Sequence, residues 1–270
     1  MEIVEAESRG VHYWAVDTWA EQGLRHGFCG ADIDILTGQE QWERAFSSPG
    51  AEARLLLLEQ VHGKEIARIG DFPGSTGFGN ENLPGASIAE ADGWLVYRGG
   101  AQLNSCFFGI KTADCFPVLF QGGRGELAGA LHCGWRGSCG GILREAIMQA
   151  CSLGMRAEEI QIAVGPGAQI CCYCVGSEVA EQCCDAFERS GGCRMRTSQD
   201  VIEQRGSKLF CNLRALLTAQ AVSCGVLPAH IVYSSHCTIC DHRFFSYRRQ
   251  KDLSGRQVSF ITGAFHSSNM

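Results

Sequence analysis

Short apolar runs bounded by Gly, Pro or Asp recur along this sequence and constrain its fold more than any other feature. Runs of this length, rich in Val, Ile, Leu and Phe, are typical of buried β-strands. Because the runs do not alternate regularly with helical patterns, we expect an α+β fold in which mixed β-sheets form a layered core flanked by helices. The expected strands are residues 54–59, 93–97, 106–111, 117–120, 127–131, 161–164, 231–234 and 258–262. The expected helices are 141–153, 177–189 and 213–224.

The helix expected at 213–224 has the best-defined ends. Asn212 is a suitable N-cap, because its side-chain oxygen can accept from an unpaired amide of the first turn. Gly225 stands where a left-handed residue would end the helix.

Composition favours one domain and argues against a nucleic-acid partner. The chain has 270 residues, 45% of them hydrophobic, and no Pro-, Ser- or Gly-rich linker, so we expect a single domain over residues 1–270. A formal net charge of −6 does not suit a phosphate backbone, which needs clustered Lys and Arg. The local basic cluster of Arg243, Arg248, Arg249 and Lys251 is large enough for one phosphate or carboxylate.

The compartment is indicated by the first residues and by the cysteines. The sequence MEIVEAESRG contains acids and no apolar segment, and no window approaches the roughly 20 apolar residues of a membrane span. We therefore expect a cytoplasmic protein with no membrane partner, in which the 16 cysteines are reduced. We favour a monomer, although the sequence does not define the oligomeric state.

Three turns share one pattern, in which an apolar strand ends in a tight polar turn that carries His or Cys. They present His62 before Gly63, Cys115 after Asp114, and His132 before a Gly-Trp-Arg-Gly segment. Taken singly, each residue has an ordinary explanation as a hydrogen-bonded loop histidine or a small buried hydrophobe. The carboxylate beside Cys115 would raise the pKa of its thiol, so a thiolate there needs a cation such as Lys111, or a metal.

The third turn is also suited to an anion. Glycines between a strand and a helix let backbone amides approach a negative group, and the helix that we expect after Gly140 and Gly141 would favour negative charge. Arg136 adds a bidentate donor for phosphate or carboxylate. The alternative is that Trp135 and Arg136 serve packing and a surface ion pair.

Six motifs, taken together, resemble one protein family. They are QVHG at 60–63, ADG at 91–93, TADCFPVLF at 112–120, HCGWRG at 132–137, CCYCVG at 171–176, and CT with FFSYRR within 237–249. In this order they resemble the YfiH family, also called the laccase-domain or polyphenol oxidase family, over residues 54 to 260. Its members include bacterial purine nucleoside phosphorylases and a peptidoglycan editing factor.

The resemblance implies a metal and catalytic centre formed by His62, Cys115 and His132. Two imidazoles and one thiolate are a common ligand set for catalytic zinc, with Zn–N of ~2.0 Å and Zn–S of ~2.3 Å and a fourth position left for water or substrate. Copper is the less favoured metal, because eight histidines without any HxH pair do not suit a multicopper centre.

The resemblance also implies a purine nucleoside and phosphate as small-molecule partners. It implies phosphorolysis of adenosine, inosine, guanosine or methylthioadenosine, and deamination of adenosine. Cys115, His132 and Asp114 are then the expected catalytic residues. The expected substrate-binding residues are Arg136, Asp92, Arg248 and Arg249, with Asp92 and Asp114 also suited to orienting a histidine.

Two departures from the family pattern affect these expectations. Cys174 stands where the family usually has Glu, so any role of that acid is in doubt here. Family members usually have a Gly/Ser-rich stretch that contains an Arg near the first strands, where this chain has HGFCGADIDILTG. The resemblance therefore does not define substrate contacts from that region.

Three other interpretations remain open. Cys115 with His132 or His62 could form a metal-free hydrolase that acts on an amide of a peptidoglycan precursor. A separate structural zinc site could form from Cys171, Cys172 and Cys174 with Cys237 and Cys240, although only the last two form a CxxC pair. A non-enzymatic protein that binds a partner through its basic segment is least favoured, because it leaves the three turns unexplained.

Overall fold

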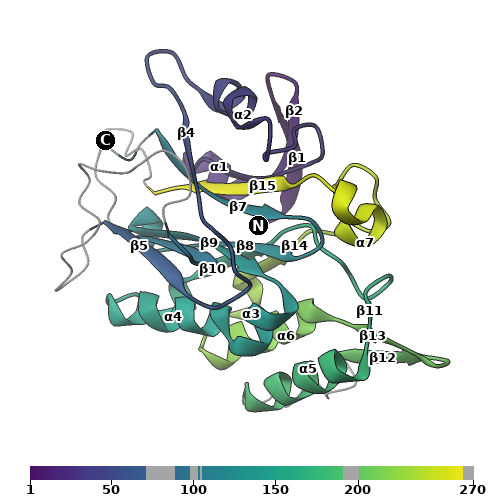
Figure 1. The fold of residues 1–270 in the computed structure, drawn as a ribbon. Coiled ribbons are helices and arrows are strands. Elements are labelled where there is room, and N and C mark those ends of the chain that lie inside the picture. The colour runs from purple at the N-terminus through teal and green to yellow at the C-terminus, as the bar shows by residue number, and fades with distance from the viewer. Residues whose placement is uncertain (71–88, 98–102, 104, 191–200, 264–270) are drawn as a thin grey trace.

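Two mixed six-stranded sheets, one stacked on the other, form the centre of the structure (Figure 1). The computed structural model describes residues 1–70, 89–97, 103, 105–190 and 201–263. The first sheet contains, in spatial order, β1 (Ile3–Ser8), β2 (Val11–Val16), β3 (His26–Cys29), β15 (Gln257–Thr262), β7 (Cys106–Thr112) and β4 (Arg54–Leu57). The second contains β14 (Ile231–Tyr233), β10 (Gln161–Val164), β8 (Phe116–Gly122), β9 (Leu127–Cys133), β6 (Gly93–Tyr97) and β5 (Ile66–Gly70). Most neighbours are antiparallel, whereas the pairs β4–β7, β5–β6 and β10–β14 are parallel.

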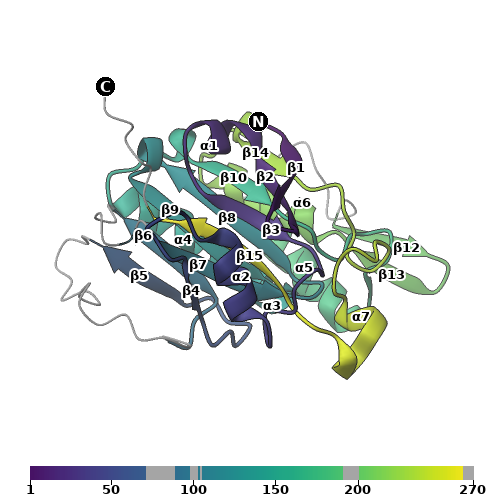
Figure 2. The ribbon, with the colours of Figure 1, turned by 90° about the horizontal axis from the view of Figure 1, so that it is seen from above.

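Helices cover the outer faces of both sheets, which gives four layers. Figure 1 shows α2 on the outer side of the first sheet and α3 to α6 on the outer side of the second. The helices are α1 (Asp17–Glu21), α2 (Gln39–Phe46), α3 (Trp135–Gly140), α4 (Ile142–Ser152), α5 (Ser177–Arg189), α6 (Leu213–Ser223) and α7 (Tyr247–Gln250). A small third sheet of β11 (Cys174–Val175), β13 (Lys208–Cys211) and β12 (Ile202–Arg205) lies with α7 at one end of the molecule (Figures 1 and 2).

The layers follow from the alternation of side chains along strands that are buried on both faces. Phe107 of β7 packs toward α2, and the next residue, Phe108, packs between the sheets. In β6 of the second sheet, Leu95 packs toward the helices, whereas Trp94 and Val96 pack between the sheets. This alternation is why both faces of each sheet need a covering layer.

The expected fold class is confirmed, and so are the expected elements. All eight strands expected from apolar runs are present with boundaries shifted by at most two residues, as are the three expected helices. The side chain of Asn212 accepts from the Ala215 amide at the start of α6, and Gly225 has the expected left-handed φ of 97°.

The elements of the first 50 residues were not expected from the sequence, and neither was the short helix α3 ahead of α4. The amphipathic helix α2, with Trp42, Ala45 and Phe46 buried, was not expected. The Gly-Trp-Arg-Gly segment is not only a turn, because α3 begins at Trp135, ahead of the expected helix.

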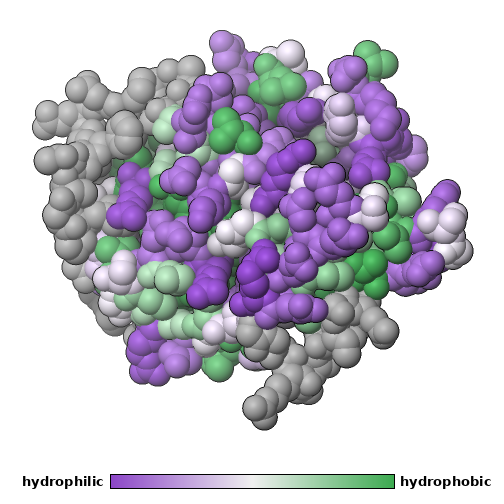
Figure 3. Space-filling view, turned by 60° about the horizontal axis from the view of Figure 1, so that its bottom comes forward, coloured by the Kyte–Doolittle hydropathy of each residue, from purple (hydrophilic) through white to green (hydrophobic). Residues whose placement is uncertain are grey.

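The surface of one face is mainly hydrophilic. In Figure 3, hydrophobic residues among those coloured lie in small groups separated by hydrophilic ones. Within the described ranges, no helix has the length and apolar character needed to cross a membrane.

Candidate active site

Three residues from separate segments of the chain, His62, Cys115 and His132, lie close together in the structure. His62 follows β4, Cys115 lies between β7 and β8, and His132 is in β9. Their ligand atoms all lie within 4.8 Å of one another, and the two imidazole rings have centroids 4.7 Å apart. His132 is buried, Cys115 is partly buried, and His62 is exposed. The structure therefore brings together the three residues that the sequence motifs predicted.

His62 adopts a strained backbone conformation, and one buried carboxylate holds it there. Its φ is 62°, in the left-handed region that disfavours a side chain. The amides of His62 and Gly63 donate to the two carboxylate oxygens of Asp92, at 3.0 and 2.6 Å. The Val61 amide donates to the same carboxylate at 3.3 Å. Asp92 thus fixes the turn that directs the His62 ring toward Cys115.

The same carboxylate also orients His132. Nδ1 of His132 lies 2.7 Å from Oδ1 of Asp92, and both side chains are buried. Since Asp92 accepts at Nδ1, the Nε2 atom is left for the cluster, as in histidines that bind metals with a carboxylate behind them. Asp92 was expected either to bind substrate or to orient a histidine. Its carboxylate contacts His132, and it does not line the cavity described below.

Asp114 has a comparable structural role on the other side of Cys115. Its φ is 90°, and its carboxylate accepts from the Thr238 hydroxyl at 2.8 Å and from the Arg248 amide at 2.7 Å. Both oxygens of this expected catalytic acid are therefore bound by the C-terminal segment. Asp114 joins the turn that carries Cys115 to α7.

Two glycines of the HCGWRG motif permit the close approach of the three turns. A Cβ atom at Gly134 would lie 3.0 Å from Cys115 Sγ and 3.3 Å from the His62 ring. A Cβ atom at Gly137 would lie 2.7 Å from the carbonyl oxygen of Gly63, which is too close for a backbone atom. The glycines are needed because α3 packs directly against the other two turns.

The electrostatics of the cluster favour a thiolate at Cys115. Burial alone would raise the pKa of its thiol, but hydrogen bonds from His132 and His62 outweigh burial and lower this pKa to about 6. Burial opposes charge on His132 as well, yet its bonds to Asp92 and Cys115 raise its pKa to about 9. Without a metal, the pair is therefore a thiolate beside an imidazolium at neutral pH. With one, the same atoms supply a thiolate and two imidazole nitrogens.

The cluster opens into a cavity of about 920 Å³, which is large enough for a ligand of nucleoside size. Its wall contains aromatic rings and cations besides the three cluster residues. The aromatic residues are Trp135, Tyr173 and Tyr247, and the cationic residues are Lys111, Arg136, Arg248 and Arg256. The three aromatics and Arg256 were not expected at the site from the sequence, although Tyr173 and Tyr247 lie inside the CCYCVG and FFSYRR motifs.

The three arginines of the cavity wall differ in the contacts that their guanidinium groups already make. The guanidinium of Arg136 lies 4.4 Å from the Trp135 ring centroid, so it is stacked beside the cavity. Arg248 stacks on Tyr173 at 5.2 Å and donates to the Cys174 carbonyl. Arg256 donates to the carbonyls of residues 254 and 255. Among these arginines, Arg136 therefore has the side chain best placed for an anion in the cavity.

Two other residues singled out from the sequence lie off the cavity wall. Arg249 was expected to bind substrate, but its guanidinium donates to the carbonyls of Thr238, Ile239 and Phe244, and it does not line the cavity. Cys174, which replaces the family's Glu, is in β11 and is not part of the cavity wall either.

Comparisons with known proteins define the family. A family model described as multi-copper polyphenol oxidoreductase laccase matches residues 34–264. Purine nucleoside phosphorylase YfiH of Escherichia coli K12 is 30% identical over 237 residues, which cover 86% of this chain and 83% of that protein. Adenosine deaminase RL5, from an unknown prokaryotic organism, is 34% identical over 162 residues, and the match spans only 59% of each protein. The crystal structure of YlmD from Geobacillus stearothermophilus has a TM-score of 0.77 at 22% identity, covering 97% of this chain and 99% of that one.

The fold consists of two stacked mixed sheets with a His-Cys-His cluster that could hold a metal ion. The chain belongs to the laccase-domain family, which includes the YfiH proteins. The resemblance seen in the sequence motifs is thereby confirmed. The named relatives are purine nucleoside phosphorylases and an adenosine deaminase, which supports an enzyme of this kind.

Proposed function

We propose that this protein is a zinc-dependent purine nucleoside phosphorylase that also deaminates adenosine. The observation that carries the proposal is the His62, Cys115 and His132 cluster, which opens into a cavity lined by aromatic rings and cations. A purine has two flat faces that suit aromatic side chains, and phosphate needs cations. The names of the relatives agree with this assignment.

The donor set fits zinc. Two imidazoles and one thiolate converge within 4.8 Å, and Asp92 orients one of the imidazoles, as expected of a catalytic site with three protein ligands. When bound, zinc supplies a Lewis acid that activates water at neutral pH. Zinc is preferred to a multicopper centre because the chain has eight histidines and no HxH pair.

Different residues of the site would bind the purine, bind phosphate and position the cluster. Trp135 and Tyr173 would hold the purine, since both rings line the cavity. Arg136 would bind phosphate and hold it for attack on C1′ as the bond to the base breaks. Asp92 would hold the His132 ring and the His62 turn in place. Asp114 would act by positioning Cys115 and Arg248, and not by transferring a proton.

We also propose that residues 1–270 form one domain. His62 follows a strand of the first sheet, and His132 lies in a strand of the second. Neither sheet alone would contain the cluster.

A second candidate function is hydrolysis of an amide in a cell-wall precursor by a metal-free Cys-His pair. The lowered pKa of Cys115 and the raised pKa of His132 favour it, because thiolate nucleophiles have this arrangement. It would require that chelation leaves activity intact.

The test is incubation of zinc-loaded and chelated protein with adenosine, with and without inorganic phosphate. We expect free adenine only with phosphate, inosine in both conditions, and loss of both products on chelation. The absence of adenine and inosine from every reaction would contradict the proposal. A parallel incubation of the chelated protein with a cell-wall precursor tests the second candidate, which hydrolysis of the amide would favour.

A further inference from the structure

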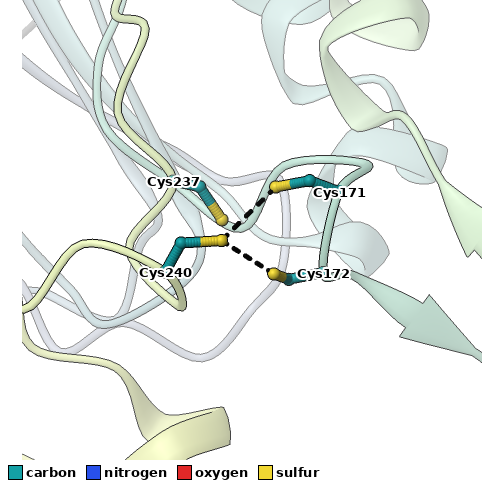
Figure 4. Close-up of side chains that lie close together, drawn as sticks. All are labelled: Cys171, Cys172, Cys237 and Cys240. Carbon is teal, nitrogen blue, oxygen red and sulfur yellow. Dashed lines mark hydrogen bonds between the residues drawn. The ribbon is translucent and has the colours of Figure 1, made fainter.

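Four cysteines outside the active site converge on one point. Cys171 and Cys172 lie in the segment before β11, and Cys237 and Cys240 lie between β14 and α7. Figure 4 shows their side chains pointing toward one another from these two segments. All four sulfurs lie within 4.8 Å of one another, with Cys172 and Cys240 at 2.8 Å and Cys171 and Cys240 at 3.6 Å.

These separations fit a tetrahedral metal site. Zn–S bonds of ~2.3 Å place the sulfurs of a tetrathiolate site roughly 3.8 Å apart, so shifts of about 1 Å or less in each sulfur would form it. A disulfide needs sulfurs ~2.05 Å apart and would use only two of the four thiols. Convergence of all four is the arrangement that a metal explains.

The backbone holds the two segments side by side. Gly167 and Cys237 form a parallel bridge, in which the Thr238 amide donates to the Gly167 carbonyl at 3.1 Å. The side chain of Gln169 donates to the carbonyl of His236 at 3.0 Å. The sulfurs are therefore brought together by main-chain structure and do not depend on flexible side chains alone.

Backbone amides favour a thiolate at one member of the cluster, Cys237. The Gln169 amide donates to Cys237 Sγ, and the amides of Ile239 and Cys240 also face this sulfur. Amides that point at the first sulfur of a CxxC turn stabilise negative charge on it. Arg205 donates to the Cys171 carbonyl at 3.2 Å, which places a cation beside Cys171 and Cys172.

We propose that Cys171, Cys172, Cys237 and Cys240 bind a second zinc ion, which has a structural role. Four protein ligands fill the coordination sphere of zinc, so no position is left for water or substrate. The sequence pattern had disfavoured such a site because only one CxxC pair is present. In the structure the adjacent pair Cys171-Cys172 supplies the other two ligands, and Cys174 takes no part.

Metal bound by the four cysteines would stabilise one wall of the active-site cavity. Tyr173, which lines the cavity, directly follows the ligand Cys172, and Arg248 stacks on Tyr173 and is linked through Asp114 to Thr238 of the CxxC turn. Metal binding would hold both segments together and so keep the Tyr173 and Arg248 side chains in place. This consequence for substrate rests on the proposed function, whereas the metal site itself does not.

The test is metal analysis of the full chain purified under reducing conditions with zinc. We expect two zinc ions per chain in the wild type, and one in the double variant Cys171→Ser/Cys240→Ser. The matched control Cys151→Ser/Cys184→Ser, which changes two cysteines outside both clusters, should keep two. His62→Ala/Cys115→Ala should also keep one zinc, bound by the four cysteines.

Cobalt substitution gives a second measurement if the double serine variant folds poorly. Cobalt bound to thiolates absorbs strongly in the near ultraviolet, and His62→Ala/Cys115→Ala should retain this band through the four cysteines. One zinc in the wild type that disappears in His62→Ala/Cys115→Ala would overturn the proposal. Iron in place of zinc, or a disulfide between Cys172 and Cys240 in the reduced preparation, would also overturn it.

Discussion

The two sulfur-containing clusters of this protein differ in how many ligands they offer and in what surrounds them. His62, Cys115 and His132 provide three ligands at the wall of a cavity of about 920 Å³. The second cluster provides four thiols from two loops that are joined by backbone hydrogen bonding at the Gly167–Cys237 bridge. Three ligands leave a coordination position for chemistry, and four leave none.

The groups that contact and support the two clusters also differ in their chemistry. The first cluster is supported by Asp92, a buried carboxylate that accepts from His132 and from three backbone amides. Behind the second stand backbone amides and the exposed cation of Arg205. A charged group that tunes a ligand suits a reactive centre, whereas main-chain support suits a fixed geometry. Four predictions separate the two clusters, from the largest expected effect to the smallest.

Replacing a residue of the first cluster should abolish activity and leave the second cluster intact. We expect Cys115→Ser to lower kcat/KM for adenosine by about 10³-fold or more, because it removes one of the three residues of the proposed catalytic centre. The measurement is steady-state kinetics together with zinc content. Matched Cys151→Ser should leave kcat/KM within about twofold. Wild-type kinetics in Cys115→Ser would remove the basis for treating this cluster as catalytic.

Asp92→Asn should weaken the first cluster selectively. The amide keeps the size of the side chain but cannot accept from His132 and three backbone amides as a carboxylate does. We expect metal affinity or activity at this site to fall by about 10–100-fold. Competition with a chromophoric chelator would measure this, and the affinity of the four-cysteine site should not change. Equal weakening of both sites would indicate general loss of folding.

The thiols of the two clusters should show different pH profiles when both metals are removed. The pKa of Cys115 is lowered to about 6, whereas burial and a hydrogen bond to Cys237 raise the pKa of Cys171 to about 11. The rate of alkylation of Cys115 should therefore be nearly constant above pH 7 and fall about tenfold per unit below pH 6. That of Cys171 should rise about tenfold per unit from pH 7 to 10. At pH 7 a much larger fraction of Cys115 than of Cys171 is thiolate. The Cys171 thiolate is more basic and therefore intrinsically more nucleophilic, which reduces the difference in rate. We expect Cys115 to react on the order of 10–100-fold faster at pH 7.

The profile is measured by mass spectrometry of peptides after brief labelling with iodoacetamide. Cys184 provides an internal reference outside both clusters. Parallel profiles for Cys115 and Cys171 would contradict the difference in electrostatics.

Substitutions of two arginines should distinguish a residue that binds phosphate from one that supports the second cluster. Arg136→Lys should raise KM for phosphate several-fold without a change in Tm, because it alters a side chain on the cavity wall. Arg249→Lys should lower stability by about 1–3 kcal/mol with little change in KM, because its guanidinium satisfies three carbonyls. Thermal denaturation and phosphate titrations check both variants. The reverse outcome would show that Arg249, as first expected from the sequence, binds substrate.

The sequence alone was enough to predict elements whose apolar pattern and cap residues lie within one short segment of the chain. Strands such as Leu127–Cys133 are continuous apolar runs, and α6 has its cap residue beside it in the chain. The strand Ile3–Ser8 was missed because exposed polar residues interrupt its apolar ones. Helix α2 was also missed, although the spacing of Trp42, Ala45 and Phe46 could have indicated it.

His62, Cys115 and His132 could be found from the sequence because each lies in a motif with a distinctive turn. The motifs showed which residues matter but not what each one contacts. Only the tertiary structure decided that Asp92 serves His132 and the His62 turn, and that Asp114 binds Thr238 and Arg248. It also decided that Cys171 and Cys172 meet Cys237 and Cys240. Partners so far apart in the chain meet only when two sheets stack and their loops pair, and no local pattern of residues encodes that pairing.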